Sequence, residues 1–376
     1  MTESRPKLRW FQFSLASLFV ITTLVAISCS WYTFEMNAAS KRRAAIEKIL
    51  EAGGQVAYYD ATYPETFGQP PGVFSWLRLI HGDQRMGHAT AVIIWGPPNG
   101  DTDLGHLKDL KDIEYLWLIG DNITDAWLVN LKDLTKMEIL ALTGSQITDA
   151  GLANLSGMTN LQSASLYSMP ITDAGLMHLK NLTSLEELNL HHTGITGAGL
   201  AELADLSNLD TLSLSNTKIT DAGVANLKEF TNIESLNLSD TGITDAGLVD
   251  MKDMKNLKSL TLNDTQITDA GLVHLKGLAN LKVLLLENTQ ITDAGLVHLK
   301  VLTNLRDLRL HNTKITDAGT VHLEDMTTLE ELYVGETEVT YNAVMTLWQT
   351  LPNCAIDGRN TPFQEIDEIE DIDLTD

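Results

Sequence analysis

Two columns of chemically active residues recur in this 376-residue sequence, at intervals of 24 residues or multiples of 24. Imidazoles placed side by side can bind a metal ion or sense pH, and carboxylates placed side by side can bind calcium. The histidines are His106, His178, His274, His298 and His322. The aspartates are Asp125, Asp149, Asp173, Asp221, Asp245, Asp269, Asp293 and Asp317. We favour simpler roles, with the histidines on a solvated outer surface and the aspartates, or the threonines before them such as Thr292, capping helix N-termini.

Groups suited to catalysis do not form a recognisable set. His191 and His192 lie close after Glu187, but no nucleophile recurs nearby. Cys29 and Cys354 are too far apart in the chain to form a disulfide framework or a zinc cluster. We therefore predict a protein that is not an enzyme and that uses no cofactor, metal ion or small-molecule substrate.

The overall charge limits the kinds of macromolecule that this chain is expected to bind. The chain has 50 acidic and 26 basic residues, for a formal net charge of −24. Nucleic-acid binding requires a basic surface, so we exclude a nucleic-acid partner. An acidic surface attracts basic or metal-bearing partners instead.

Most of the chain is built from a repeating unit of 24 residues. Ile-Thr-Asp-Ala-Gly-Leu begins intact at Ile147, Ile171, Ile243, Ile267 and Ile291, and variants begin at Ile123, Ile195, Ile219, Ile315 and Val339. Within one unit, leucines at 272, 275 and 278 are spaced by three, a spacing that drifts about 60° per step around a helix, so the helix must be short. Leu284 and Leu286 alternate as in a strand. Each unit is thus a short helix, a turn and a short strand, and successive strands form a parallel sheet through right-handed crossovers.

The pattern Leu-x-x-Leu-x-Leu-x-x-Thr-x-Ile-Thr-Asp-Ala-Gly-Leu, over about residues 100–357, resembles the leucine-rich-repeat family. It is nearest to the ribonuclease-inhibitor-like and cysteine-containing classes of that family. The family's usual Asn or Cys after the strand is replaced by Thr193, Thr217, Thr241, Thr265, Thr289, Thr313 and Thr337, whose hydroxyl groups can still hydrogen-bond the turn. The resemblance implies an α/β solenoid with a curved parallel sheet inside, short helices outside, and protein binding on the concave face.

Two more distant resemblances bear on function. Together with its N-terminal segment, the repeat resembles predicted bacterial single-span membrane proteins of the same family. Some related repeat proteins instead select substrates for a ubiquitin-ligase-like machine, which is our alternative function. That role requires an F-box-like helical module before the repeats, and residues 41–90 look too short and too rich in strand for one.

An uncharged segment runs from Phe11 to Trp31. As a helix it would be about 32 Å long, enough to cross a hydrocarbon core of about 30 Å. We predict a single transmembrane anchor, with two alternatives: a secretory signal cleaved after Ala26 and Ser28, or a lipoprotein signal that ends at Cys29. Basic residues flank the segment equally on both sides. Because short basic tails before such anchors usually stay inside, we expect an exported repeat domain.

Five segments follow from these patterns: a basic tail over 1–10, the anchor over 11–31, a juxtamembrane helix and N-terminal cap over 32–90, the solenoid with its C-terminal cap over 91–357, and a disordered acidic tail over 358–376. The first solenoid strand is expected near residues 91–95. Eleven strands at about 4.8 Å each give a concave sheet of about 50 Å.

The concave face is predicted from the strand residues that flank the buried leucines. At its N-terminal end these residues are Trp95, Tyr115, Trp117, Ile119, Ile139 and Tyr167, and farther along they include His191, Arg309, His311 and Tyr333. Exposed aromatic residues on a rigid curved sheet are typical of binding hot spots. The alternative is that the N-terminal cap or the juxtamembrane helix covers them.

Overall fold

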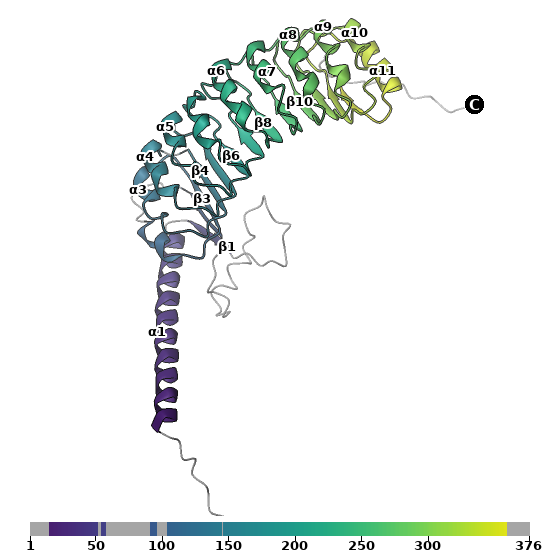
Figure 1. Cartoon of the computed structure of the whole chain (residues 1–376). Helices are drawn as coiled ribbons and strands as arrows, with labels where there is room; N and C mark the ends of the chain where they lie inside the picture. Colours follow the sequence, from purple (N-terminus) through teal and green to yellow (C-terminus); the bar gives the residue numbers. More distant parts are fainter. Residues whose placement is uncertain (1–14, 52–53, 58–90, 96–103, 145, 359–376) are drawn as a thin grey trace, which may run out of the picture.

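A computed structural model of the chain describes residues 15–51, 54–57, 91–95, 104–144 and 146–358. Figure 1 shows an arc in which strands line the inner side and short helices the outer side, with one long helix extending from the N-terminal end. The parallel-sheet solenoid expected from the repeat is therefore confirmed.

A single sheet of 13 strands, in chain order, forms the inner side of the described structure. β1 (Gln55–Ala57) is antiparallel to β2 (Ala91–Trp95), and every later pair is parallel. The remaining strands are β3 (Tyr115–Ile119), β4 (Ile139–Thr143), β5 (Ser163–Tyr167), β6 (Glu187–Asn189), β7 (Thr211–Ser213), β8 (Ser235–Asn237), β9 (Ser259–Thr261), β10 (Val283–Leu285), β11 (Asp307–Arg309), β12 (Glu331–Tyr333) and β13 (Ala355–Asp357). The eleven strands expected from the repeat are extended by β1 at one end and β13 at the other.

Short helices connect the strands on the outer side. The α-helices are α3 (Asp125–Leu128), α4 (Asp149–Leu152), α5 (Asp173–Leu176), α6 (Asp221–Val224), α7 (Asp245–Met251), α8 (Asp269–Leu272), α9 (Asp293–Leu296), α10 (Asp317–Thr320) and α11 (Tyr341–Thr350). The 3-10 helices are η1 (Leu104–Asp109), η2 (Ala153–Leu155), η3 (Ala198–Leu203), η4 (Ala225–Glu229), η5 (Val273–Gly277) and η6 (Leu299–Val301). Most are a single turn long, as the three-residue spacing of the leucines requires.

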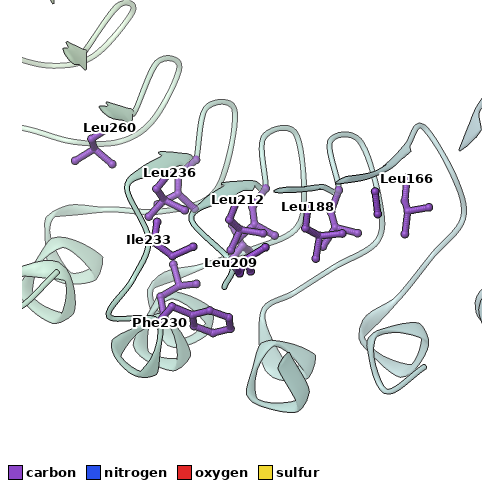
Figure 2. Packing of buried hydrophobic residues seen from close by; sticks show 14 of the residues in the cluster. Leu166, Leu188, Leu209, Leu212, Phe230, Ile233, Leu236 and Leu260 are labelled. Atoms are coloured by element: carbon purple, nitrogen blue, oxygen red, sulfur yellow. The ribbon is translucent and has the colours of Figure 1, made fainter. Parts of the chain in front are cut away.

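The core is a set of aliphatic columns that run through the stacked units. Leu188, Leu212, Leu236 and Leu260 occupy equivalent positions on adjacent strands, and each is at most 1% exposed (Figure 2). Because one unit buries its leucines mainly against its neighbours, the array is stable only as a stack.

Threonines close most units at two points. The residue three places after the second strand leucine donates its hydroxyl to that leucine's carbonyl, as Thr289 does to Leu286 at 2.6 Å, so the predicted substitute for Asn or Cys is confirmed. In most units the threonine before the helix caps it, as Thr292 Oγ1 accepts the N–H of Ala294 at 3.3 Å. Of the two residues predicted as the cap, the threonine is therefore confirmed and the aspartate is wrong, because the aspartate is the first residue inside its helix.

Helix α1 (Leu15–Glu51) is continuous through the predicted juxtamembrane helix. Its last turns pack on the first unit through buried Ala45 and Ile49, and Arg42 Nη1 lies 3.0 Å from Asp112 Oδ2. This helix therefore covers the N-terminal end of the solenoid core, as a cap should.

The predicted membrane anchor requires correction. In the part of the chain that the structure describes, no helix has a stretch long and apolar enough to cross a membrane. A span needs about 20 consecutive apolar residues. The described side chains of α1 as far as Phe34 are uncharged but include five Ser and Thr residues, and charged residues follow from Lys41. The structure thus contradicts a single-pass membrane protein anchored between Phe11 and Trp31 with an exported repeat domain.

Three predicted segments lie outside the described residues. These are the basic tail over 1–10, most of the N-terminal cap over 32–90, and the acidic tail over 358–376 apart from Gly358.

Candidate binding surface

Strand alternation divides each unit into buried and inner-facing side chains. In β3 and β5 the first, third and fifth residues are half-buried, and the two between them are buried in the core. Since neighbouring strands pair with a constant offset of 24 residues, equivalent inner-facing residues stand side by side across the sheet. The inner face therefore presents three zones in chain order: aromatic, polar and charged.

The aromatic patch comprises Tyr115, Trp117, Ile119, Ile139 and Tyr167, all half-buried on β3, β4 and β5. The rings of Tyr115 and Trp117 are stacked, with centroids 6.3 Å apart and planes 12° apart. Trp95 lies on β2 with its backbone paired to Ile119, while its side chain is outside the described structure. These residues were predicted to lie together on the inner face, and the strand register places them there.

Carboxylates border the aromatic patch. Glu114 and Glu138 immediately precede β3 and β4, and Tyr115 Oη donates to Glu138 Oε2 at 3.4 Å. The nearby Lys136 donates to Asp112 Oδ1 at 2.7 Å, and this hydrogen bond, followed by the charge of Asp112, raises the pKa of Lys136. Lys136 is thus bonded to Asp112, whereas among the described residues the carboxylate of Glu138 accepts the Tyr115 hydroxyl.

The middle of the inner face carries uncharged polar side chains. His191 Nδ1 lies 2.8 Å from Ser215 Oγ, and Ser215 is 7% exposed. Glu187 accepts a hydrogen bond from Ser163 at 3.0 Å, not from His191. This histidine–serine contact lacks both an accessible hydroxyl and a carboxylate that orients the imidazole, so it has no triad geometry.

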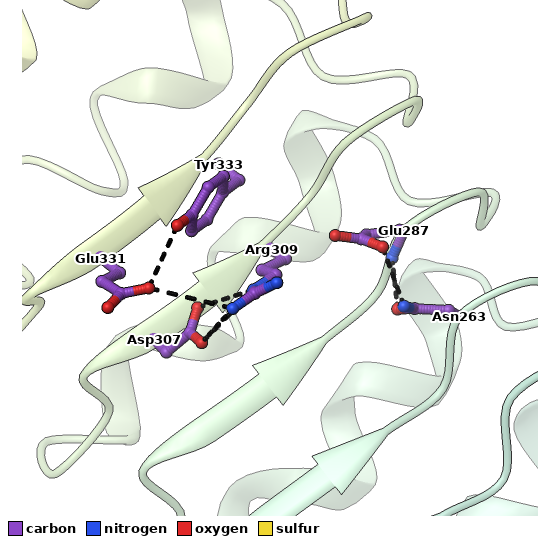
Figure 3. Close-up of polar contacts among 6 residues, drawn as sticks. All are labelled: Asn263, Glu287, Asp307, Arg309, Glu331 and Tyr333. Carbon is purple, nitrogen blue, oxygen red and sulfur yellow. Dashed lines mark hydrogen bonds and ion pairs between the residues drawn. The ribbon is translucent and has the colours of Figure 1, made fainter. Parts of the chain in front are cut away.

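The arginine cluster lies near the other end of the sheet and comprises Asp307, Arg309, Glu331 and Tyr333 on β11 and β12 (Figure 3). Arg309 Nη2 donates to Asp307 Oδ2 at 3.1 Å, and its guanidinium lies 4.6 Å from the ring centroid of Tyr333. Tyr333 Oη donates to Glu331 Oε2 at 3.2 Å. The hydrogen bond to Asp307 raises the pKa of Arg309, and the one to Glu331 raises the pKa of Tyr333.

The ten predicted site residues do not form one site. The six aromatic and aliphatic ones lie on β2 to β5, and Arg309 and Tyr333 lie on β11 and β12. His191 and His311 lie two residues beyond the ends of β6 and β11. At about 4.8 Å per strand, β5 and β11 are roughly 29 Å apart. Any single contact would therefore engage one zone, and only an extended partner would reach both.

The recurring histidines and aspartates are residue types that could bind a metal ion. Among the described residues, no group of three or more His, Cys, Asp or Glu could hold a metal ion. The aspartates instead bridge successive units, a role that the sequence interpretation missed. Asp269 Oδ1 accepts the N–H of Thr292 at 2.8 Å, and its Oδ2 accepts the hydroxyl of Thr292 at 2.6 Å. The signal available in the sequence was the recurrence of Thr and Asp together at the same spacing.

Comparison with known proteins finds matches to both the repeats and the fold of this chain. A family model described as "Leucine Rich repeat" matches residues 133–156, 181–204, 205–228, 231–251 and 253–275, and one described as "Leucine Rich repeats (2 copies)" matches residues 279–324. The structure is similar to that of an internalin, InlF, from Listeria monocytogenes, with 22% identity, a TM-score of 0.54, and coverage of 73% of this chain and 87% of that chain. No curated protein sequence matches significantly.

Two further solved structures resemble the chain over shorter stretches. An internalin C2 from Listeria monocytogenes is 27% identical, with a TM-score of 0.44 and coverage of 55% of this chain and 82% of that chain. A repeat protein from Leptospira interrogans is 16% identical, with a TM-score of 0.43 and coverage of 67% of this chain and 80% of that chain.

Proposed function

Because the chain belongs to the leucine-rich-repeat proteins, which generally mediate protein–protein interactions, we propose that it binds a protein partner through its concave sheet face. The aromatic patch is the anchor of this contact. The observation that carries the proposal is the half-buried, stacked pair Tyr115 and Trp117 on a sheet whose register holds both rings in place. Tyr and Trp in such positions supply large contact areas and are enriched in binding hot spots.

The proposal assigns a binding role without catalysis. Burial of Ser215 removes the hydroxyl beside His191 from solvent. Burial also raises the pKa of the Cys354 thiol to about 11, with a smaller contribution from the charge of Glu331, so this cysteine stays protonated near neutral pH. These features support an interaction module.

The test is capture from a solubilised extract of the source cell on immobilised full-length chain, followed by mass spectrometry. The test variant is Tyr115→Ala with Trp117→Ala. Its matched control is Tyr341→Ala with Trp348→Ala, which removes one exposed tyrosine and one exposed tryptophan from outer helix α11. Circular dichroism checks that both variants remain folded.

We expect a protein that the wild type and the α11 variant retain but the patch variant loses. Each hot-spot truncation costs about 2 kcal/mol or more, so the affinity should fall by roughly 30-fold or more. Equal retention by all three proteins would remove the aromatic patch from the proposal. Failure of every form to retain a protein would count against the binding role itself.

A further inference from the structure

The arginine cluster shows how this sheet holds a guanidinium group. Arg309 and Tyr333 are direct partners across β11 and β12. Arg309 lies over the Tyr333 ring, donates to Asp307, and has its Nη2 3.9 Å from Glu331 Oε2 (Figure 3). The guanidinium therefore lies over a ring face, donates to one carboxylate and forms an ion pair with a second.

The aromatic patch contains the same two components, an aromatic ring and a carboxylate that accepts from a tyrosine. Tyr115 donates to Glu138 at 3.4 Å, as Tyr333 donates to Glu331, and the Trp117 ring is stacked beside Tyr115. The cross-strand partners of Trp117 are Ile93 and Ala141, which carry no charge. Among the described lysines and arginines, none forms an ion pair with Glu138 or lies over the Trp117 ring.

The surroundings of the patch favour a positively charged occupant. The residues immediately before β3, β4, β6 and β7 form a carboxylate track, which comprises Glu114, Glu138, Glu186 and Asp210. Backbone hydrogen bonds join neighbouring members, with Glu138 N donating to Glu114 O at 2.8 Å and Asp210 N donating to Glu186 O at 2.9 Å. Strand spacing therefore places Glu138 about 4.8 Å from Glu114, and Asp210 about 4.8 Å from Glu186, along one edge of the sheet. Gln162, the residue before β5, separates the two pairs. The net charge of −24 adds a longer-range attraction for a basic segment.

We propose that the aromatic patch binds an arginine side chain in an extended basic segment of the protein partner. The guanidinium lies against the Trp117 ring and donates to Glu138, and other basic residues of the segment follow the carboxylate track. Arginine fits better than lysine because its planar group stacks on an aromatic face and donates several N–H groups in fixed directions. The inference rests on the proposed role of the concave face and specifies the chemistry of the partner.

The test measures fluorescence anisotropy of a labelled peptide, Gly-Arg-Gly-Ser-Arg-Gly, with the full-length chain at low ionic strength. A second peptide carries citrulline, the uncharged analogue of arginine, at both arginine positions. We expect the citrulline peptide to bind roughly tenfold more weakly, as loss of a cation–π contact and a charged hydrogen bond implies. Equal binding of the two peptides would overturn the proposal.

Single substitutions test where on the protein the arginine peptide binds. Trp117→Ala and Glu138→Gln should each weaken binding of the arginine peptide by about tenfold. Glu202→Gln, which removes an exposed charge on outer helix η3, should leave it unchanged. An equal loss in Glu138→Gln and Glu202→Gln would indicate non-specific attraction to an acidic protein and overturn the site.

Two further outcomes separate this inference from the proposed function. If the arginine peptide binds only after Arg78→Ala and Arg85→Ala substitutions, the chain's own segment between β1 and β2 is the occupant, and the assignment to a partner is wrong. If partner capture depends on Tyr115 and Trp117 but the arginine peptide does not bind, the arginine preference is wrong and the binding role of the patch stands.

Discussion

The substitution Asp269→Ala tests whether aspartate bridges couple the stacked units. The carboxylate accepts the N–H and the hydroxyl of Thr292 in the next unit, at 2.8 and 2.6 Å. Hydrogen bonds to a charged group contribute about 1.5–3 kcal/mol each, and both residues are half-buried. Because solvent can replace part of the interaction, we expect a loss of about 2–3 kcal/mol in the free energy of unfolding.

The same bridge explains the glycine two residues after each aspartate. A Cβ atom added at Gly295 would meet Asp269 Oδ1 at 2.3 Å, so the carboxylate occupies the space of a side chain. Gly295→Ala should therefore destabilise the wild type, although alanine is the better helix former by about 1 kcal/mol. In the Asp269→Ala background this clash is absent, so Gly295→Ala should lower the free energy of unfolding by less than in the wild type, or should raise it. The two substitutions must then be non-additive.

The assay is urea unfolding followed by circular dichroism, with Asp253→Ala as the control because the Asp253 side chain is exposed. The free energies of unfolding can be compared only between variants for which this energy falls with urea at a similar slope. A defect in a repeat array can make its two parts unfold separately, and the slope would then change. The reasoning is refuted if Asp269→Ala changes stability by less than about 0.5 kcal/mol, the range of ordinary surface substitutions. It is also refuted if Gly295→Ala has the same effect in both backgrounds.

Three other predictions follow from the described contacts. At pH 8, iodoacetamide should modify exposed Cys29 in the folded protein but not buried Cys354, whose pKa of about 11 keeps it protonated; equal rates would contradict this. Thr289→Val should lower the free energy of unfolding by about 1–2 kcal/mol, because the Leu286 carbonyl loses a buried 2.6 Å hydrogen bond, and an unchanged thermal midpoint would argue against this role. Gly197, with φ of +97°, occupies the place of the bridging aspartate, so this bridge is missing between its unit and the next. In hydrogen–deuterium exchange, backbone amides of the next unit should therefore exchange roughly tenfold or more faster than those in bridged units. Uniform exchange rates would show that the bridge adds no local stability.

The sequence alone was sufficient to predict the repeating architecture. Leucines spaced by three cannot stay on one helix face, and leucines spaced by two must lie on one face of a strand, so the elements followed from the period and spacing. The strand expected near residues 91–95 is β2, and the threonine hydroxyls bond the turns as expected. Strand alternation also predicted which side chains face inward.

Tertiary structure decided which of these side chains contact one another. The aspartates recur as helix caps would, yet their carboxylates reach Thr residues 23 positions later, because stacking brings successive helix starts within hydrogen-bond distance. Tyr115 and Tyr333 were both predicted as inner-facing residues, but only the structure distinguishes them. Arg309 lies over the ring of Tyr333, while Tyr115 is stacked on Trp117. Such differences depend on contacts between units, whereas the repeat pattern specifies one unit at a time.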